Sequence, residues 1–379
     1  MSNLLNVSFY INKNKGSEYE VGYKYAYILG EIFKKVTVIC PFEEILAMDL
    51  KIRSIGPFKF AREGNILFVA FKRIPSQIYR FHRVNYFIWV LFIQVYFLIG
   101  FRKSRSYHFI TPVQAYSPII IQCFRNVILG PMSVFPTWLA FSKNVPFKIR
   151  AKSFISLILA NTFLLLKIYC CEKCKYIFIH KFELLHNKPN VFTLPSLIFD
   201  FKNNNNNKNN KNNKNIVFSG RDIAVKNVTL HEKIFKILSH NFPNYNFILI
   251  SDRYKNDFIV DDNLFFSPIL DKDKYYNILN ETILNVFLSF EMGGISSLEA
   301  CMYGAPTLTL ERNGVSEYLK PSRDFIVQIE LLNKPYLIAK MIEKIINEEL
   351  YKSEIDRQLS TLKFYNLDNT INGLKQVYK

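Results

Sequence analysis

Short apolar runs alternate with amphipathic segments throughout the C-terminal half of this 379-residue chain. An apolar run of five or six residues is typical of a buried strand, and apolar residues repeated every three or four positions are typical of a helix. The clearest strand candidates are Asn215–Ser219, Asn246–Ile250, Asn285–Ser289 and Ala305–Leu310, and the clearest helix candidates are Val228–Leu238 and Pro335–Glu348. The alternation predicts a doubly wound α/β domain with a parallel sheet, which binds ligands at the carboxyl ends of its strands.

The N-terminal half begins with the same alternation, at Leu5–Ile11, Val21–Phe33 and Val36–Cys40. Residues 203–215 hold ten Asn and three Lys, and without apolar groups to offset the ordering entropy they are predicted to form a solvated linker. A weakly basic tract for nucleic acid is the alternative interpretation. We therefore predict an N-terminal domain at residues 1–200, a linker at 201–215 and a C-terminal domain at 216–363.

The positive charge of the chain is concentrated in its first half. Residues 1–200 hold 26 Lys and Arg against 10 Asp and Glu, a net charge of +16, whereas residues 201–379 hold 23 against 21, a net charge of +2. The N-terminal domain is therefore expected to face an anionic partner, which is nucleic acid, an anionic membrane or a phosphate-bearing substrate. Hydrophobic residues make up 49% of the chain, so global disorder is excluded.

Two apolar stretches in the N-terminal half, Val84–Gly100 and Ser153–Tyr169, have three interpretations. Basic residues flank Val84–Gly100 on both sides, and Asn85 and Gln94 lie within its 17 residues. This length, polarity and symmetric charge disfavour a transmembrane span. A buried helix of the domain and a helix docked on anionic lipid remain as alternatives.

The chain starts without the basic residues and long apolar core of a secretory signal, so we expect a cytosolic location. Its six cysteines are too dispersed for a disulfide framework. Cys171 and Cys174 form one Cys-x-x-Cys, but the second pair or neighbouring His pair of a zinc site is missing from the sequence around them. No metal site is predicted.

The sharpest chemical feature is a pair of carboxylates in Phe290–Pro306, FEMGGISSLEACMYGAP. Glu291 follows a predicted strand, and Glu299 falls in the first turn of the helix that is predicted to start near residue 296. Carboxylates accept hydrogen bonds from vicinal hydroxyls, which recognition of a sugar or a ribose requires. The alternative is that Glu299 only complements the helix dipole and that Glu291 is a surface charge of the loop.

The residues between these carboxylates are suited to bind an anion. Gly293 and Gly294 form a bend, and Ser296 and Ser297 are expected to cap the helix that follows. A strand, a Gly-rich bend and a helix N-terminus direct several backbone N–H groups to one place, which predicts a site for phosphate or sugar.

A second cluster, Ser219–Lys226 (SGRDIAVK), follows the first strand after the linker. Arg221 offers a bidentate fork for phosphate and Lys226 offers a point charge, so the pair would balance a diphosphate leaving group without a metal. Ordinary surface basic residues are the alternative interpretation. Gly16, after the first strand of the chain, permits close approach of the backbone to a ligand, although a lone glycine is a weak signal.

Together these features resemble the glycosyltransferases of the GT-B fold and, more narrowly, glycosyltransferase family 4, a large retaining group. The strongest likeness is FEMGGISSLEACMYGAPTLTLERNGVSEYL, and weaker likeness lies in KGSEYEVGYKYA and YHFITPVQAYSPIIIQCFRNVILGP. The resemblance implies two doubly wound Rossmann-like domains that face each other across a donor-binding cleft. It also implies that the final helix, residues 364–378, packs back on the N-terminal domain.

The resemblance implies a role for each residue of the C-terminal clusters. Glu299 would bind the ribose hydroxyls, and Glu291 would hold the donor sugar near the reacting anomeric carbon. Arg221 and Lys226 would stabilise the departing diphosphate. The remaining donor-binding positions, which would offer backbone N–H groups or a hydroxyl to sugar or phosphate, are Gly293, Gly294 and Ser296.

Two further positions are implied on the N-terminal side. Gly16 would line the donor cleft from the N-terminal domain, and His108 would contact the donor sugar or assist from the acceptor side. For His108, a structural or surface histidine is the alternative interpretation.

We therefore expect an enzyme that transfers a sugar from a nucleotide-sugar to an acceptor hydroxyl, with the retention that the family implies. Neither a cofactor nor a protein-bound metal is expected. Because the N-terminal half is basic and apolar, the expected acceptor is a lipid-linked glycan of bacterial surface polysaccharide, such as O-antigen or capsule, at the inner face of the cytoplasmic membrane. A soluble acceptor is the first alternative. The second, a basic nucleic-acid-binding protein, is disfavoured because the basic residues are dispersed among apolar segments and form no nucleic-acid-binding motif.

Overall fold

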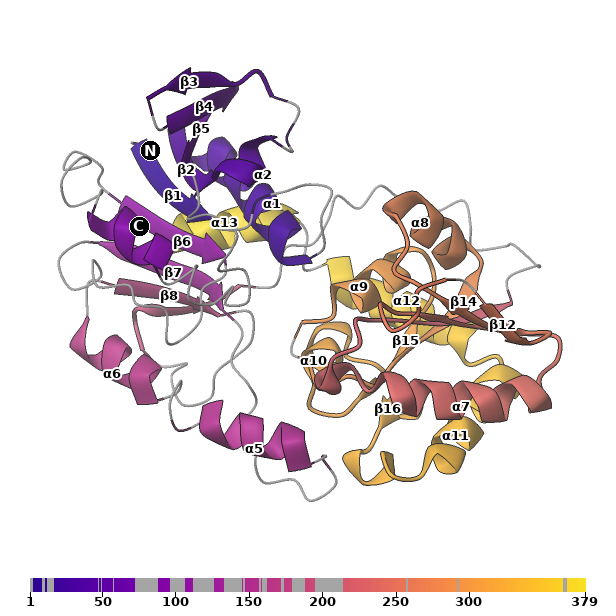
Figure 1. Ribbon diagram of the computed structural model, residues 1–379. Coiled ribbons are helices and arrows are strands. Elements are labelled where there is room, and N and C mark those ends of the chain that lie inside the picture. Colours follow the sequence, from indigo (N-terminus) through magenta and orange to yellow (C-terminus); the bar gives the residue numbers. More distant parts are fainter. Residues whose placement is uncertain are drawn as a thin grey trace. The chain divides into compact units, whose positions relative to one another are not determined.

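The computed structural model (Figure 1) describes residues 3–8, 11, 17–46, 48, 50–56, 58–71, 88–95, 106–111, 126–132, 145, 147–156, 158, 162–171, 174–178, 188–194, 214–256, 258–291, 293–363 and 367–379. The chain divides into two compact units. Unit 1 comprises Met1–Val134, Ile155–Leu197 and Leu367–Lys379, and unit 2 comprises Phe135–Phe154 and Ile198–Asn366.

Unit 1 is built on a nine-stranded sheet with the order β3-β4-β5-β2-β1-β6-β7-β8-β9. Its strands are β1 (Asn3–Ser8), β2 (Lys35–Pro41), β3 (Arg53–Ile55), β4 (Phe58–Glu63), β5 (Ile66–Phe71), β6 (Ser106–Thr111), β7 (Val127–Met132), β8 (Cys174–Phe178) and β9 (Val191–Thr193). The seven strands from β5 to β9 in this order pair in parallel, and β3 and β4 extend the β5 edge as antiparallel strands. A parallel sheet of this kind requires helices on both faces.

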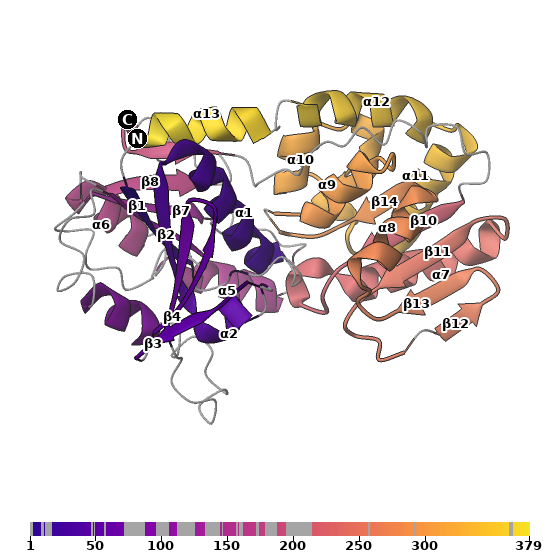
Figure 2. The ribbon, with the colours of Figure 1, turned by 90° about the horizontal axis from the view of Figure 1, so that it is seen from above.

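The helices of unit 1 cover both faces of this sheet. They are α1 (Ser17–Ile32), α2 (Phe42–Leu46), the helical segment 88–95, α6 (Thr162–Cys170) and α13 (Leu367–Val377). Neighbouring side chains of a strand point to opposite faces, and β2 shows this clearly. Val38 packs in the core that contains Leu29 of α1 and Leu374 of α13, whereas Ile39 packs in the core that contains Trp89 and Ile168. The final helix α13 therefore belongs to the core of unit 1, beside α1 (Figure 2).

The apolar stretch predicted at Val84–Gly100 contains a described helix at residues 88–95. Trp89, Val90 and Ile93 are buried in the core of unit 1, while Phe92 and Val95 are 62% and 55% exposed. Within the part of the chain that the structure describes, no helix is both long and apolar enough to cross a membrane. The second stretch, residues 153–169, contains the end of α5 (Phe147–Ser156) and most of α6, which begins at Thr162.

Unit 2 is built on a seven-stranded sheet with the order β12-β13-β11-β10-β14-β15-β16. Its strands are β10 (Asn215–Ser219), β11 (Asn246–Ile250), β12 (Phe258–Asp261), β13 (Leu264–Ser267), β14 (Thr282–Phe287), β15 (Thr307–Leu310) and β16 (Ile326–Val327). Every pairing is parallel except that of β12 with β13. All six residues of β14 are buried, as expected for a strand at the centre of a sheet that is covered on both faces.

The helices of unit 2 lie on opposite sides of its sheet, with α7 and α11 on one side and α8 and α9 on the other (Figure 1). They are α7 (Val228–Asn241), α8 (Lys272–Asn280), α9 (Ile295–Met302), α10 (Gly314–Leu319), α11 (Pro335–Asn347) and α12 (Tyr351–Leu362), with short 3₁₀ turns at Ala224–Lys226, Arg323–Phe325 and Ile329–Leu331. Ile338, Ile342 and Ile345 of α11 recur at helical spacing, so one stripe of the helix enters the core against α7. The prediction of two doubly wound α/β units is confirmed by this topology.

The chain enters unit 2 earlier than the predicted boundary at residue 200. Val145 and Ile149, the latter in α5, are buried in the main core of unit 2, and residues 135–154 are part of that unit. The sequence places these residues in the N-terminal domain because they precede the linker, and the pattern around α5 contains no signal of which core it joins.

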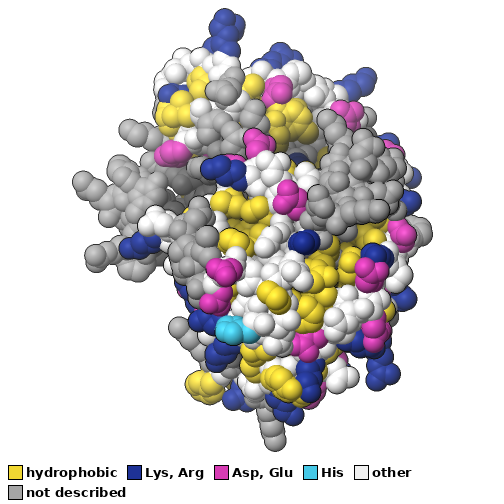
Figure 3. All heavy atoms as spheres, turned by 90° about the vertical axis from the view of Figure 1, so that its right-hand side faces the viewer, with side chains coloured by type: hydrophobic (Ala, Val, Ile, Leu, Met, Phe, Trp, Pro, Cys, Tyr) yellow, Lys and Arg dark blue, Asp and Glu magenta, His cyan; other side chains and the backbone are white. Residues whose placement is uncertain are grey.

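The face of the molecule in Figure 3 carries basic and acidic side chains of both signs interspersed among polar and apolar ones. On the described residues visible there, neither sign gathers into a large patch. This mixture agrees with the net charge of only +2 for residues 201–379.

Candidate active site

Two of the predicted clusters meet where adjacent strands of unit 2 end. β10 and β14 are parallel neighbours, so the loop after β10, Gly220–Asn227, and the loop after β14, Leu288–Gly294, leave the same edge of the sheet. The Nζ atom of Lys226 lies 2.5 Å from the Oε2 atom of Glu291. The sequence predicted both residues for the donor site, and the structure brings them into direct contact.

Lys226 is held in a narrow apolar setting. Only 10% of its side chain is exposed, and its ammonium group lies 4.7 Å from the centroid of the Phe287 ring. Gly220 makes room for the stem of this lysine, because a Cβ atom at residue 220 would lie 2.9 Å from Phe218 and 3.1 Å from Lys226. A glycine at this position is therefore required by packing within the protein.

The loop that carries Glu291 is tied to the loop that carries Lys226 by backbone contacts. The carbonyl oxygen of Val225 accepts from the Ser289 hydroxyl at 3.0 Å and from the Phe290 N–H at 2.8 Å. The Ser289 hydroxyl oxygen in turn accepts from the Glu291 N–H at 3.1 Å. Asn313 donates from its amide to the carbonyl of Ser289 at 3.1 Å, which fixes the loop from a third side. These contacts set the position of Glu291 before any ligand binds.

A buried histidine that sequence reasoning missed supports the same loop. His231 of α7 accepts from the Leu288 N–H through its Nε2 atom at 3.1 Å, so its Nδ1 atom carries the proton and donates to the Asn227 carbonyl at 2.9 Å. The imidazole stacks on Phe218 with ring centroids 3.7 Å apart. Complete burial lowers the pKa of His231 to about 3, so the ring is neutral at pH 7 and keeps its acceptor.

The two glycines of the bend, Gly293 and Gly294, lie in different surroundings. Gly294 has φ +114°, and a Cβ atom there would lie 2.3 Å from Val315, so both backbone conformation and packing require glycine. A Cβ atom at Gly293 would meet no atom of the described chain within 4 Å. Gly293 therefore faces open space, and its side-chain-free surface is available to a ligand.

The helix after the bend starts earlier than the sequence predicted. α9 begins at Ile295, with Gly294 as its N-cap, and no side chain caps it. The expectation that Ser296 and Ser297 cap this helix is therefore wrong, because the left-handed Gly294 takes that position. Glu299 consequently lies in the second turn and not in the first.

Glu299 lies beside a group of tyrosines that sequence reasoning did not single out. Tyr276 of α8 donates to its Oε1 atom at 3.3 Å, and Tyr303 stacks on Tyr276 with centroids 4.9 Å apart. Burial and, after it, the Glu299 carboxylate raise the pKa of Tyr275 far above its usual value. The hydrogen bond from Tyr276 helps to orient the Glu299 carboxylate, and the signal for this contact in the sequence was the adjacent pair Tyr275 and Tyr276.

Arg221 is exposed at the end of β10, five positions before Lys226, and no partner of its guanidinium lies in the described part of the chain. Ser296 is half-buried in the first turn of α9. Arg221, Lys226, Glu291 and the Gly293–Glu299 segment thus all lie in or directly beside loops of unit 2 that follow strands.

His108 is not part of this site in unit 2. It lies in β6 of unit 1, wholly buried, with its Nδ1 atom 2.5 Å from the Tyr378 hydroxyl and its Nε2 atom 2.8 Å from the Gly130 carbonyl. Burial lowers the pKa of His108 to about 4. Both ring nitrogens have protein partners, so the geometry gives His108 a structural place, and its contact with a donor sugar stays a prediction. Gly16 lies outside the described residues.

Groups of three or more His, Cys, Asp or Glu side chains that suit a metal ion do not occur among the residues that the structure describes. The expectation that the reaction needs no protein-bound metal stays a prediction.

Comparison with known proteins supports the assignment of unit 2. Residues 200–360 match the model of the family described as glycosyl transferases group 1. This stretch contains both clusters of the candidate site, and the prediction of a nucleotide-sugar glycosyltransferase is confirmed at this level. No curated protein matches the chain in sequence.

Solved structures show the same fold along the whole chain. A UDP-forming α,α-trehalose-phosphate synthase from Burkholderia xenovorans is similar with a TM-score of 0.65 and 10% identity, covering 100% of this chain and 99% of that one. A structure described as trehalose-6-phosphate from E. coli bound with UDP-2-fluoro glucose gives a TM-score of 0.63 and 12% identity, covering 99% of this chain and 98% of that one. TarM gives a TM-score of 0.64 and 11% identity, covering 100% and 99%. The GT-B fold prediction is confirmed, whereas membership of family 4 itself stays a prediction.

Proposed function

We propose that this protein transfers a sugar, with retention of anomeric configuration, from a nucleoside diphosphate sugar to a hydroxyl of a lipid-linked glycan. The observation that carries the donor half of this proposal is the contact between Lys226 and Glu291 at the carboxyl ends of β10 and β14. A cation and a carboxylate that are held together there, beside the open face of Gly293, offer complementary partners to a diphosphate and to sugar hydroxyls.

The proposed chemistry places positive charge where the leaving group becomes more negative. As the bond between the anomeric carbon and the diphosphate breaks, the electron pair stays on the phosphate oxygen and the sugar becomes oxocarbenium-like. Lys226 and the exposed Arg221 stabilise that growing negative charge. The backbone N–H groups at the start of α9 add to this stabilisation, so we propose that no metal takes part.

The two carboxylates have separate roles in the proposal. Glu299, whose orientation is fixed by Tyr276, accepts hydrogen bonds from the ribose hydroxyls. Glu291 accepts from hydroxyls of the donor sugar and is the counter-ion of Lys226 while the site is empty of donor. Binding of the donor then exchanges one anionic partner of Lys226 for another, which limits the cost of removing this buried cation from water.

The proposed acceptor rests on unit 1 and is independent of the donor argument. The segment 88–95 and α6 bury one apolar side, yet Phe92, Leu166 and Tyr169 remain 62%, 55% and 60% exposed. Exposed apolar side chains on helices of a half with net charge +16 suit the interface of an anionic membrane, where a lipid-linked acceptor is found. We therefore propose peripheral docking on the inner face of the cytoplasmic membrane and synthesis of bacterial surface polysaccharide.

A soluble acceptor is the second candidate. The solved structures with the same fold include a UDP-forming α,α-trehalose-phosphate synthase, whose name gives a sugar phosphate as its product. At 10% and 12% identity this likeness shows the fold alone and does not decide the acceptor. The test therefore includes soluble acceptors beside the lipid extract.

One experiment tests donor and acceptor together. The purified protein is incubated with a panel of UDP- and GDP-sugars and either a membrane-lipid extract or a set of free sugars and sugar phosphates, with and without EDTA, and products are identified by mass. Transfer to the lipid fraction that EDTA leaves unchanged is the expected result. Transfer only to soluble sugars would replace the proposed acceptor, and thermal stabilisation by oligonucleotides alone would overturn the whole proposal.

Membrane docking has its own test. Co-sedimentation with vesicles that contain anionic phosphatidylglycerol is expected, with weak binding to neutral phosphatidylcholine vesicles. Replacing Phe92 and Leu166 by Ser is expected to reduce sedimentation severalfold, whereas Ile269→Ser, which changes a similarly exposed apolar residue of unit 2, is the matched control. Equal sedimentation of both variants would contradict docking through unit 1.

A further inference from the structure

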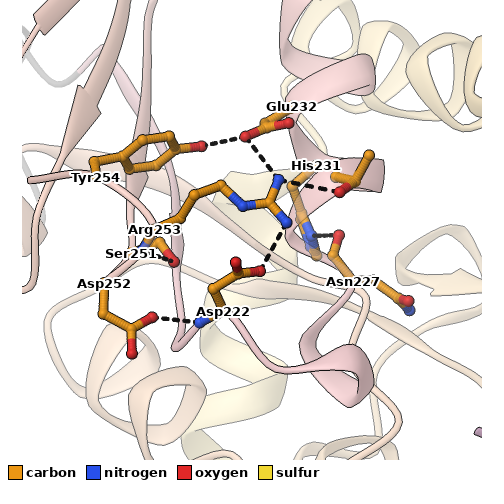
Figure 4. Close-up of polar contacts among 9 residues, drawn as sticks. Asp222, Asn227, His231, Glu232, Ser251, Asp252, Arg253 and Tyr254 are labelled. Carbon is orange, nitrogen blue, oxygen red and sulfur yellow. Dashed lines mark hydrogen bonds and ion pairs between the residues drawn. The ribbon is translucent and has the colours of Figure 1, made fainter.

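Arg253 joins three elements at the end of the sheet that carries the candidate site (Figure 4). It follows β11, and its Nη2 atom lies 2.7 Å from the Oδ1 atom of Asp222 in the loop after β10. Its Nη1 atom lies 3.0 Å from the Oε1 atom of Glu232 and 3.0 Å from the Thr229 hydroxyl, both on α7. Glu232 is itself fixed, because the Tyr254 hydroxyl donates to the same oxygen at 2.6 Å.

Arg253 contacts the loop Gly220–Asn227, which carries both basic residues of the donor site. Asp222 is the next residue after Arg221 and precedes Lys226 by four positions. Asp222 is held twice: its carboxylate by Arg253, and its N–H by the Asp252 carboxylate. The segment after β11 therefore controls the course of Gly220–Asn227 immediately beside Arg221.

We infer that Arg253 is a positioning residue that fixes the loop Gly220–Asn227, and through it Arg221, for binding of the donor diphosphate. This inference rests on the proposed function and adds to it a residue that neither the sequence motifs nor the leaving-group argument includes. Among the described residues, the side-chain partners of Arg253 are Asp222, Glu232 and Thr229, none of which we assign to direct donor contact, so its effect on the donor passes through Asp222.

The local structure shows why the backbone beside Arg221 requires this support. The loop contains only one short 3₁₀ turn, Ala224–Lys226, and Arg221 is exposed on a long flexible side chain. Lys226 is placed by its own burial, whereas Arg221 has no packing of this kind, so the backbone at Asp222 decides where it starts. A group that must meet a diphosphate is effective only if its backbone is already in place.

The contacts of Arg253 also balance charge near the proposed diphosphate. Asp222 and Asp252 place two carboxylates at this loop, and a third, Glu232, lies on α7. The hydrogen bond that Arg253 donates to Asp222 and, after it, the one that it donates to Glu232 raise the pKa of Arg253, so the guanidinium stays charged at every accessible pH. A planar guanidinium bridges Asp222 and Glu232 at once, which the single ammonium of a lysine does not.

The test compares Arg253→Met and Arg253→Lys with Lys344→Met, which removes an exposed ion pair to Asp324 elsewhere in unit 2. Binding of UDP, GDP, uridine and guanosine is measured by calorimetry in each variant. Arg253→Met is expected to weaken the preferred diphosphate about tenfold and to leave the matching nucleoside within about twofold, because only the diphosphate uses Arg221. Arg253→Lys is expected to be intermediate and Lys344→Met to match the wild type.

A double-mutant cycle separates positioning from a general loss of stability. In an Arg221→Met background, adding Arg253→Met is expected to weaken the diphosphate by less than about twofold, since the residue through which it acts is gone. Amide hydrogen exchange of residues 220–227 in the ligand-free protein is expected to be faster in Arg253→Met alone. Additive effects in the cycle, equal weakening of nucleoside and diphosphate, or unchanged exchange would each overturn the inference.

The outcome also separates this inference from the proposed function. If the wild-type protein binds neither UDP nor GDP, the proposed function fails and the role of Arg253 in donor binding fails with it. If the wild type binds a diphosphate and Arg253→Met binds it equally well, the inference alone is wrong.

Discussion

The Nζ atom of Lys226 and the Oε2 atom of Glu291 lie 2.5 Å apart, joining the loops after two neighbouring parallel strands. Each residue is the other's charge partner, and the backbone around them is fixed by the Val225 carbonyl, which accepts from both Ser289 and Phe290. Because the two charges neutralise each other in the empty site, loss of the Glu291 charge and loss of the Lys226 charge are expected to have opposite effects on diphosphate binding.

Glu291→Gln is expected to reduce kcat by about 100-fold or more, because the carboxylate that holds the donor sugar is lost. The same change is expected to tighten binding of UDP or GDP by about threefold, since Lys226 no longer has a competing anion. Lys226→Met is expected to weaken that binding instead. Calorimetry and steady-state kinetics measure both effects, and weaker diphosphate binding by Glu291→Gln would contradict the assigned pairing.

Glu299→Gln is expected to weaken binding of UDP or GDP by about tenfold or more, through loss of charge-assisted hydrogen bonds to ribose. A 2′,3′-dideoxy analogue lacks those hydroxyls, so its affinity is expected to be the same for wild type and variant. Glu281→Gln, an exposed carboxylate at the end of α8, is the control. If the variant and the wild type discriminate equally between nucleotide and analogue, Glu299 does not bind ribose.

Gly294→Ala is expected to lower the stability of the protein, whereas Gly293→Ala is expected to weaken donor binding. At Gly294 the methyl group meets Val315 and the backbone has φ +114°, so the free energy of unfolding is expected to fall by about 2 kcal/mol or more. At Gly293 the methyl group enters open space, so stability is expected to change by less than about 0.5 kcal/mol while the KM for donor rises. Chemical denaturation together with donor kinetics distinguishes the two, and a stable, fully active Gly293→Ala would remove Gly293 from the donor site.

His231 predicts a pH dependence of stability. Its pKa is about 3 in the folded protein and about 6.5 in an unfolded chain, so below pH 6.5 the unfolded state binds more protons than the folded state. The free energy of unfolding therefore decreases as the pH is lowered. Between pH 7 and pH 5 this residue alone is expected to cost about 2 kcal/mol of unfolding free energy. His231→Gln keeps an acceptor for the Leu288 N–H without the titration, and denaturation at both pH values is expected to show a smaller difference. An identical pH difference in wild type and variant would exclude the protonation of His231 as its source.

The sequence pattern predicted the main strands and helices of unit 2, because each strand is a short apolar run buried on both faces. β12 was not predicted: it lies in a polar segment after Asn246–Ile250, and it is an edge strand of the sheet that pairs with β13. The start of α9 at Ile295 was also missed, since a left-handed Gly294 and a capping serine both suit a helix start and the choice between them depends on packing against Val315.

Residues of the candidate site could be predicted where they lie together in one sequence motif. Contacts between residues that are far apart in the sequence could not be predicted. Glu291 and Lys226 could be placed at the same sheet edge, because both directly follow strands. Their direct contact, the hydrogen bond of His231 to the loop, and the contact of Arg253 with Asp222 arise only when α7, β10, β11 and β14 are brought together. The hydrogen bond from Tyr276 to Glu299 likewise joins two helices.

The place of α13 has a consequence for how the chain acquires its structure during synthesis. Residues 367–379 supply Leu374 and Val377, both fully buried, to the core that begins with β1 and α1. A nascent chain emerges from the ribosome N-terminus first, so the sheet of unit 1 lacks this covering helix until residues 367–379 have been made. Unit 2, whose residues end at Asn366, has all of its parts sooner. The half that is made first is thus the half that is completed last, and its uncovered sheet face needs protection from aggregation in the interval.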